Sequence, residues 1–481
     1  MKHAIFLSVC WALIPTIPML WMNNWDGILG FPYTDLYPSV WSLWAFSHSD
    51  WMHTNVLNYP KGMGWYPPSI IHAFIAIPLQ NIVEMGTLYN ILLIFFRFLC
   101  PLLTYLAARS WEVSHKGSLL ITVVFACSPF CHGFAVEGII EGLNAWTIPL
   151  WLYFCGIRHR TGMIASFALC CISNWYFGAC ISVMTIIIAL RRMDVLWSFV
   201  GLFLVAPFVW LFVSAWSTIM PLGSQLQQDM SISVMDFLPN FTMLPTPLAK
   251  NNYISWIVLM ILLFHRHRDM WIIFVPLLLS LNILGWLPLF EHIRFPYRFH
   301  AMTLLLVGYF AAPYIKKNWV IYAILIEQIM VGGLNFFIPV QKARSNGNYE
   351  QVDGPVLHLP GTFAMSPGVV NPARKRYQEI LLAQMQHQQP LQNKGDFNSL
   401  EGEWIFDIWL QQDLLYKKER PKITDRDIET LQKTRIRYIA VHPQWLHPNT
   451  IQEIQHNTRV ELISDQSSEN LILFKVLDED F

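Results

Sequence analysis

Long apolar runs, separated by short polar turns, follow one another through about the first two thirds of the chain. A run of about 20 apolar residues can cross the roughly 30 Å hydrocarbon layer of a bilayer as a helix. The pattern therefore predicts a polytopic α-helical membrane protein with about eleven transmembrane helices. The predicted spans are 4–22, 87–108, 117–132, 142–157, 161–173, 176–190, 194–214, 252–265, 269–287, 298–314 and 319–338.

Two of these spans, 161–173 and 176–190, are short for the hydrocarbon layer. Asn174 and Trp175 separate them, and Tyr176 begins the second span. We therefore expect the two spans to form a tight hairpin about these residues.

Basic residues are concentrated in alternate turns between the predicted spans. These turns hold Lys2, Arg109, Lys116, Arg158, Arg160, Arg191, Arg192, Arg266, Arg268, Lys316 and Lys317. Because Lys and Arg are in excess in cytoplasmic loops, we predict a multi-pass protein of the plasma (inner) membrane with a cytoplasmic N-terminus. The alternation requires the short apolar segment 69–83 to lie on the outer surface, within a first outer loop at 23–86.

The composition changes near Pro339 to polar sequence that contains Gln, Asp and Lys. An odd number of spans separates this part from the cytoplasmic N-terminus, so we predict a transmembrane domain at 1–338 and an extracytoplasmic domain at 339–481. Strands are predicted at 355–360, 435–442, 459–464 and 470–477, and helices at 372–387, 424–433 and 448–456. The second domain is therefore expected to be a small α/β domain.

Composition and charge exclude some classes of protein. Charged residues make up 13% of the chain, whereas a soluble globular protein has about 25%. The net charge of zero gives no reason to expect a nucleic-acid partner. All eight cysteines lie in or beside apolar runs with no metal-ligand spacing, which favours a role in helix packing.

A single acidic residue, Asp35, opens a Trp-rich segment in the first outer loop. Tyr37, Val40, Trp41 and Trp44 fall at helical spacing, which is typical of a helix lying in the membrane interface. An acid held at the membrane surface is a candidate catalytic base. The alternative is that Asp35 only caps the helix.

Two arginines, Arg294 and Arg298, precede the predicted span at 298–314. Arginine binds phosphate groups in a bidentate manner, so this pair at the outer membrane edge is a candidate site for a phosphate or pyrophosphate. The alternative is that the side chains reach toward lipid headgroups and that one of them pairs with Glu291.

Glu137 and Glu141 lie in the predicted outer turn between the third and fourth spans. At a spacing of i and i+4, both carboxylates could lie on one helix face, as a metal site or a base requires. The alternative is a pair of exposed loop acids. Four histidines are also expected near the outer face: His72, His132, His292 and His300.

Several motifs resemble those of the GT-C superfamily of integral-membrane glycosyltransferases, particularly uncharacterised bacterial members. They are TDLYPSVWSLW, NYPKGMGWYPPSIIHAFIAIPL, NWYFG, RFPYRF and RIRYIAVHP. The resemblance implies that Asp35 acts as catalytic base or positions a divalent ion such as Mg²⁺ or Mn²⁺, and that Arg294, Arg298 and Lys61 hold a lipid phosphate. Many members carry two acidic residues in the first outer loop, whereas here Asp35 stands alone.

The implied function is transfer of a sugar from a polyprenyl-phosphate-linked donor, on the outer face of the bilayer. The acceptor would be a glycan, a lipid or a protein. The alternative is a non-catalytic role in membrane transport, as a flippase, or in the assembly of cell-surface glycans. Such a transporter is expected to place polar or charged groups along its path, and Arg97 is the main charge deep in a predicted span.

Overall fold

The computed structural model of the chain describes residues 1–21, 27–32, 35–49, 53–54, 56, 63–64, 69–216, 253–265, 267–281, 296–332, 336–345, 347–359, 372–389, 425–433, 435–446, 448–469 and 471–477. The chain divides into two compact units. We call Met1–Ser39, Pro68–Leu211 and Pro221–Gln341 the helical unit. The α/β unit comprises Val40–Pro67, Phe212–Met220 and Lys342–Phe481.

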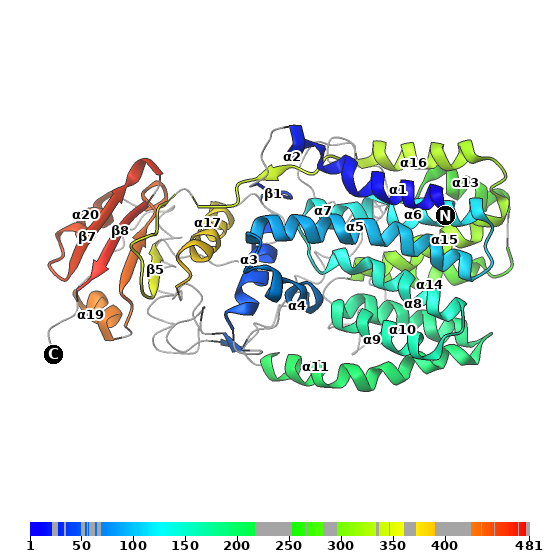
Figure 1. Ribbon diagram of the computed structural model, residues 1–481, viewed down its shortest axis with the longest axis horizontal. Coiled ribbons are helices and arrows are strands. Elements are labelled where there is room, and N and C mark those ends of the chain that lie inside the picture. Colours follow the sequence, from blue (N-terminus) through cyan, green and yellow to red (C-terminus); the bar gives the residue numbers. More distant parts are fainter. Residues whose placement is uncertain are drawn as a thin grey trace. The chain divides into compact units, whose positions relative to one another are not determined.

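Helices make up most of the helical unit (Figure 1). Its α-helices are α1 (Lys2–Leu13), α2 (Ile17–Trp21), α4 (Ile70–Leu79), α5 (Met85–Ser110), α6 (His115–Ala126), α7 (Pro129–Val136), α8 (Thr147–Gly156), α9 (Arg160–Ser173), α10 (Trp175–Ala189), α11 (Gly201–Trp216), α13 (Trp256–Phe264), α14 (Phe274–Ser280), α15 (His300–Ala311) and α16 (Asn318–Gly332). Short 3-10 helices are η1 (Ile14–Thr16), η2 (Gly142–Trp146), η3 (Met193–Val200), η6 (Met270–Ile273), η7 (Pro296–Phe299) and η8 (Ala312–Tyr314).

Each predicted span contains at least one helix, and the apolar helices mark an integral membrane protein. By length and composition, three described helical segments can cross a membrane: Lys2–Met19, Met85–Ser110 and Met193–Trp210. A fourth is α6 with α7, bent by 43° at the break between them. Other apolar helices are shorter, so the predicted count of eleven spans stays a prediction.

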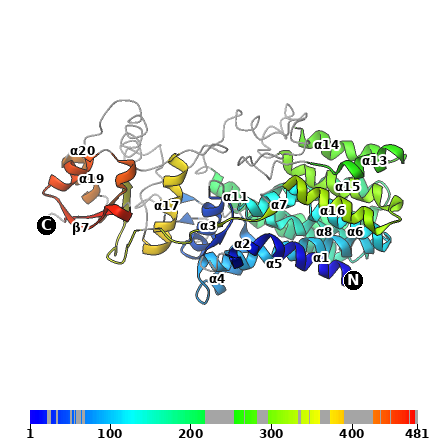
Figure 2. The ribbon, with the colours of Figure 1, turned by 90° about the horizontal axis from the view of Figure 1, so that it is seen from above.

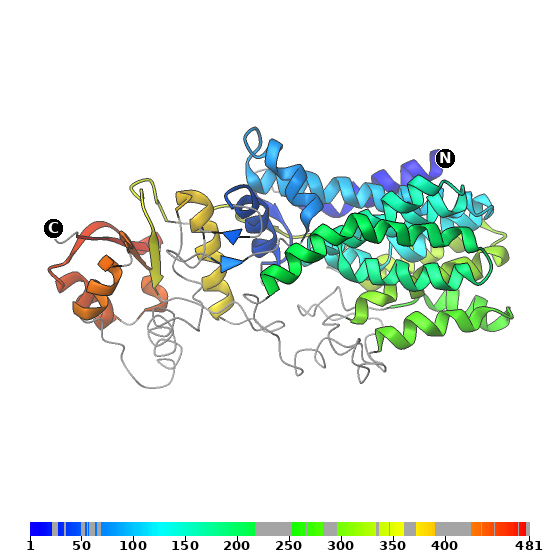
Figure 3. The same ribbon diagram turned by 90° about the horizontal axis from the view of Figure 1, so that it is seen from below.

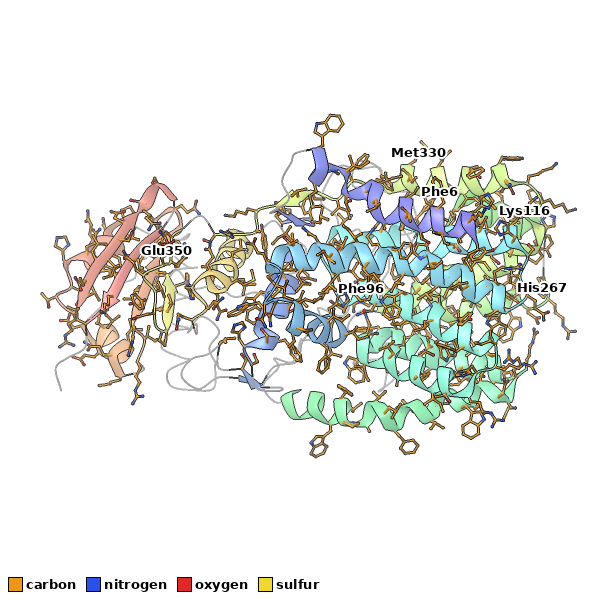
Figure 4. All side chains as sticks on the ribbon, viewed as in Figure 1. Phe6, Phe96, Lys116, His267, Met330 and Glu350 are labelled. Carbon is orange, nitrogen blue, oxygen red and sulfur yellow. The ribbon has the colours of Figure 1, made fainter. Side chains whose placement is uncertain are left out.

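The long helix α5 contacts several other helices of the helical unit. It packs against α1, α6 and α8, and α6 packs in turn against α15 and α16 (Figure 2). Figure 3 shows α11 running along the same bundle. Large apolar side chains such as Phe6, 71% exposed, and Met330, 62% exposed, point outward from the bundle (Figure 4). Contact with lipid explains this exposure, which water would disfavour.

Residues of several turns predicted to be cytoplasmic come together at one end of the helical unit. Lys116 Nζ donates to the carbonyl of Lys316 over 2.8 Å, and the rings of His3 and His115 lie 5.5 Å apart. Figure 4 shows Lys116 and His267 at this same end. This common location agrees with the prediction that these turns lie on one side of the membrane. Which side of the membrane this end faces stays a prediction.

The predicted hairpin is confirmed, with Asn174 as the residue between α9 and α10. Its backbone is extended, and its Oδ1 accepts hydrogen bonds from the backbone N–H groups of Tyr176 (3.0 Å) and Phe177 (3.3 Å). An asparagine in this position satisfies N–H groups that have no partner within the helix. The side chain of Asn174 therefore ends one helix and begins the next.

The helix predicted after Asp35 is present as α3 (Leu36–Ser47), and its place in the membrane interface stays a prediction. Tyr37, Val40, Trp41 and Trp44 are buried, and Leu43 and Phe46 on other sides of the helix are buried as well. Apolar residues all round are typical of a helix packed within protein.

The α/β unit contains a four-stranded sheet in the order β5 (Val356–Leu359), β6 (Tyr438–Val441), β8 (Leu471–Val476) and β7 (Val460–Gln466). The pair β5 and β6 is parallel, and the other two pairs are antiparallel. The helices are α17 (Pro372–His387), α19 (Asp425–Lys433) and α20 (Pro448–His456). The predicted strands and helices of this region are therefore all present. A short hairpin pairs β2 (His53–Thr54) with β3 (Met63–Gly64).

Alternation along the strands gives the sheet two buried faces. Ile439 and Phe474 on one face pack with Ile428 of α19 and Ile454 of α20. On the other face, the ring of His358 in β5 stacks on that of His387, the last residue of α17. The sheet thus lies between helices on both sides.

Three buried histidines meet on the α17 face of the sheet. His358 Nδ1 lies 3.0 Å from His442 Nε2, and their rings are stacked with centroids 5.3 Å apart. Burial lowers the pKa of His387 to about 3 and holds the pKa of His358 well below its usual value. His358 and His387 are therefore neutral in the folded unit at neutral pH.

The α/β unit should lose stability in mild acid. The unfolded chain takes up protons on these histidines below about pH 6.5, whereas the folded unit does not. At pH 5 the free energy of unfolding should fall by about 2 kcal/mol per histidine relative to pH 7. Urea unfolding read by pulse proteolysis on the detergent-solubilised protein measures it.

His387→Leu should remove its share of this pH dependence. His456→Asn, at an exposed histidine of α20, is the control and should keep the pH dependence of the parent. Equal unfolding free energies at pH 7 and pH 5 would contradict the assignment.

Candidate functional site

The segment that leads to Asp35 lies along the end of α7 in the helical unit. β1 (Ile28–Leu29) pairs with β4 (Val340–Gln341), and the Asn90 side chain of α5 holds Leu29 N at 2.9 Å. Farther on, Phe31 N donates to the carbonyl of Val136 and Asp35 N to that of Glu137, over 2.6 Å and 3.2 Å. These bonds fix Asp35 against the turn that carries Glu137.

Asp35 directly precedes α3, in the N-cap position. Its carbonyl accepts the first intrahelical hydrogen bond, from Ser39 N over 2.8 Å, and the residue is exposed. The capping position that the sequence suggested is therefore real. It is compatible with a role in catalysis, since the carboxylate lies at the surface of a fixed helix terminus.

Gly138 allows the turn after α7 to approach α3 closely. Its φ is +67°, and a Cβ at this position would lie 2.5 Å from the Cα of Leu36. Only glycine fits such a backbone conformation and contact without strain. The turn that carries Glu137 and Glu141 therefore lies beside the segment that carries Asp35.

The expected arrangement of these two acids on one helix face is wrong. The glycine turn and an irregular stretch separate Glu137, at the end of α7, from Glu141, which precedes η2. Glu137 is buried, with 6% of its surface exposed.

An ion pair between Arg298 and Glu141 joins η7 to this turn. Arg298 Nη2 donates to Glu141 Oε1 over 2.8 Å, and the two side chains are 3% and 21% exposed. The Arg298 guanidinium also lies 4.9 Å from the ring centroid of Tyr176. A buried arginine that pairs with a carboxylate and lies over an aromatic ring has a fixed orientation.

The α9–α10 hairpin secures the acid from the other side. Asn174 Nδ2 donates to the backbone carbonyl of Glu141 over 2.9 Å. Asn174 caps α10, which also carries Tyr176, so the hairpin positions both the acid and the ring that contact Arg298. Four chain segments therefore converge, those around Asp35, Glu141, Asn174 and Arg298.

Other predicted site residues lie outside the described part of the chain. They are Lys61, Glu291, His292 and Arg294. Within the described ranges, no three His, Cys, Asp or Glu side chains gather closely enough to hold a metal ion. A role for Mg²⁺ or Mn²⁺ stays a prediction.

His132 and His300, two of the histidines expected near the outer face, pack against other side chains inside the helical unit. His132 Nδ1 lies 3.0 Å from Arg97 Nη1, and Arg97 Nη2 also donates to the carbonyl of Trp11 over 2.9 Å. His300 packs against Phe130, with ring centroids 5.6 Å apart. These contacts explain the buried charge that the sequence placed in a predicted span.

The sequence reading missed Glu327, an acid within the apolar helix α16. Its carboxylate accepts hydrogen bonds from Tyr253 Oη, Ser255 Oγ and, over 2.7 Å, Trp256 N. It therefore caps the start of α13, a position that favours negative charge. A lone acid in an apolar run was the available signal.

Glu141→Gln should destabilise the helical unit, because it leaves the Arg298 charge buried without its carboxylate. Removing one partner of a buried pair costs about 3 kcal/mol or more. Thermal unfolding of the purified protein in detergent should show a midpoint several degrees lower. Glu112→Gln, at an exposed acid of the same unit, is the control.

The double variant Glu141→Leu with Arg298→Met should recover most of the lost stability, since it removes both charges. If the single and double changes were simply additive, the two side chains would not interact.

Comparisons with known proteins were made in three ways. No protein-family model matches the chain. No curated protein matches its sequence. Solved structures do match it, among them the arabinofuranosyltransferase AftD from Mycobacteria.

The AftD match has a TM-score of 0.67 at 13% sequence identity, and covers 100% of this chain and 40% of that one. Two structures of an AftD mutant match with TM-scores of 0.62 and 0.56, also at 13% identity, over 42% and 41% of their length. The chain thus spans about two fifths of the AftD chain. The likeness shows a shared fold.

Proposed function

We propose that this protein is a glycosyltransferase of the GT-C type. It transfers a sugar from a polyprenyl-phosphate-linked donor to a glycan, lipid or protein acceptor on the outer face of the plasma membrane. The observation that carries the proposal is the convergence of Asp35, the Glu137–Glu141 turn and buried Arg298 in the helical unit. The fold shared with AftD supports it.

Arg298 is assigned to the donor phosphate. A guanidinium has five N–H donors in a planar fork that matches phosphate geometry. Glu141 accepts from Nη2, which fixes the orientation of the fork. The positive charge would stabilise the negative charge that develops on the departing phosphate. Lys61 and Arg294 are proposed to bind the same phosphate.

Asp35 is assigned as the general base. The acceptor hydroxyl oxygen attacks the anomeric carbon while Asp35 takes its proton, and the bond from that carbon to the phosphate oxygen breaks. The polyprenyl phosphate leaves with the bonding electrons. A single displacement of this kind inverts the anomeric centre. If a divalent ion is bound, Asp35 would help to hold it, and the ion would offset phosphate charge.

The alternative, non-catalytic transport or assembly, receives no support from the described intramembrane charges. Arg97 is bonded to His132 and to a backbone carbonyl, and Glu327 caps a helix. Both charges are explained by structural contacts, whereas a transport path needs groups that face its contents.

Asp35→Asn should lower glycosyl transfer by at least about 100-fold, because it removes the base and leaves the helix terminus intact. Product formed by purified protein in nanodiscs from a panel of polyprenyl-phosphate sugars, detected by mass spectrometry, measures the effect. Asp269→Asn is the matched control, because it changes only surface ion pairs with Arg191 and His267, which contribute little to stability. Undiminished product from well-folded Asp35→Asn protein would refute the assignment.

A further inference from the structure

A second group of buried polar side chains lies in the helical unit, next in the chain to Glu141. We call Ser69, His72, Phe96, Asn144 and Trp146 the Asn144 cluster. Asn144 Nδ2 donates to Ser69 Oγ over 2.8 Å, and Ser69 Oγ lies 2.6 Å from His72 Nδ1. All five residues are at least nine-tenths buried.

Phe96 of α5 links the two ends of this cluster. Its ring centroid lies 4.4 Å from that of His72 and 5.5 Å from that of Trp146, with the planes of Phe96 and Trp146 12° apart. Figure 4 shows Phe96 inside the bundle of the helical unit. Phe96 therefore contacts the rings of both His72 and Trp146, and Ser69 connects His72 to Asn144.

Three polar atoms of the cluster are buried and have no hydrogen-bond partner among the described residues. They are His72 Nε2, Asn144 Oδ1 and Trp146 Nε1. Burying one such atom is costly, and native proteins pair the great majority of them. Three together, on side chains that contact one another through Ser69 and Phe96, point to a ligand that supplies their partners.

The hydrogen-bond chain favours one role for each atom. Because Asn144 Nδ2–H donates to Ser69 Oγ, the Ser69 hydroxyl hydrogen can go to His72 Nδ1, and His72 then carries its proton on Nε2. His72 Nε2 and Trp146 Nε1 are thus donors, and Asn144 Oδ1 is an acceptor. Hydroxyl groups, which both donate and accept, match this set.

The cluster is tied to the site described above. Asn144 and Trp146 belong to η2, which begins directly after Glu141. Asn144 Nδ2 also donates to the carbonyl of Ser173 over 3.1 Å, beside the Asn174 that holds Glu141. One hairpin corner therefore positions both the ion pair and the cluster.

We infer that the Asn144 cluster binds the hydroxyl groups of a sugar ring. The inference rests on the proposed function and names the part of the substrate that Arg298 does not bind. The cluster offers neutral donors, a neutral acceptor and aromatic surroundings, which suit an uncharged sugar better than a phosphate. The sugar belongs to the donor or to the acceptor.

Trp146→Phe tests the inference, because it keeps the aromatic contact with Phe96 and removes only the Nε1–H. The full-length protein in nanodiscs is titrated with a farnesyl-phosphate-linked pentose, its 2-deoxy and 3-deoxy analogues, farnesyl phosphate and a free methyl pentofuranoside. The variant should bind a sugar probe about tenfold more weakly and discriminate less against one deoxy analogue. Farnesyl phosphate should bind parent and variant equally.

Trp151→Phe is the matched control. Trp151 is fully buried in α8, but its Nε1 donates to Ser198 Oγ over 2.9 Å, so its loss should leave sugar binding unchanged. If Trp146→Phe does not fold, as judged by thermal unfolding, His72→Phe serves instead, since it keeps a ring against Phe96 and removes Nε2.

The outcomes separate the two proposals, because binding is measured without turnover. Weakening confined to the lipid-linked probe assigns the cluster to the donor sugar, and weakening of the free glycoside assigns it to the acceptor. The inference is overturned if parent and variant bind all sugar probes equally, or if no sugar probe binds. Buried water would then be the partner of the three polar atoms. Failure of the proposed function would show instead as absent transfer.

Discussion

The ion pair between Arg298 and Glu141 is the interaction on which the site depends, because a charge this deeply buried needs a partner in a fixed place. Glu141 can supply that charge only if the turn after α7 keeps its shape. Gly138 permits the turn and Asn174 fastens it. Backbone carbonyls of the same turn also accept hydrogen bonds from the segment that leads into α3. The turn therefore positions Asp35 as well as Glu141.

Under the proposed function, this arrangement would separate two chemical tasks within one unit. The exposed acid stands at a helix start, where an acceptor hydroxyl can reach it, and the buried cation stands where water is excluded. Charge that develops on a leaving phosphate is stabilised more strongly in such surroundings than in water. The Asn144 cluster adds neutral groups beside the pair, which completes a set suited to phosphate, sugar and acceptor.

Much of the secondary structure could be predicted from local pattern. The hairpin at Asn174 and the strands and helices after Pro339 follow from apolar periodicity and turn residues. The site could be predicted only as separate residues, since nothing local links Arg298 to Glu141 across 157 positions. The acids at 137 and 141 were expected on one helix face, but a glycine turn broke the helix. Burial of α3 on all sides was also missed, because lipid and protein neighbours favour the same apolar residues.

The most direct test of the account is a structure of the protein in nanodiscs with a phosphonate analogue of a polyprenyl-phosphate sugar. The account predicts that the phosphonate oxygens lie within about 3 Å of the Arg298 guanidinium nitrogens, with the anomeric carbon facing Asp35. A phosphonate bound away from Arg298, with the Arg298–Glu141 pair unchanged and Asp35 far from the sugar, would contradict it.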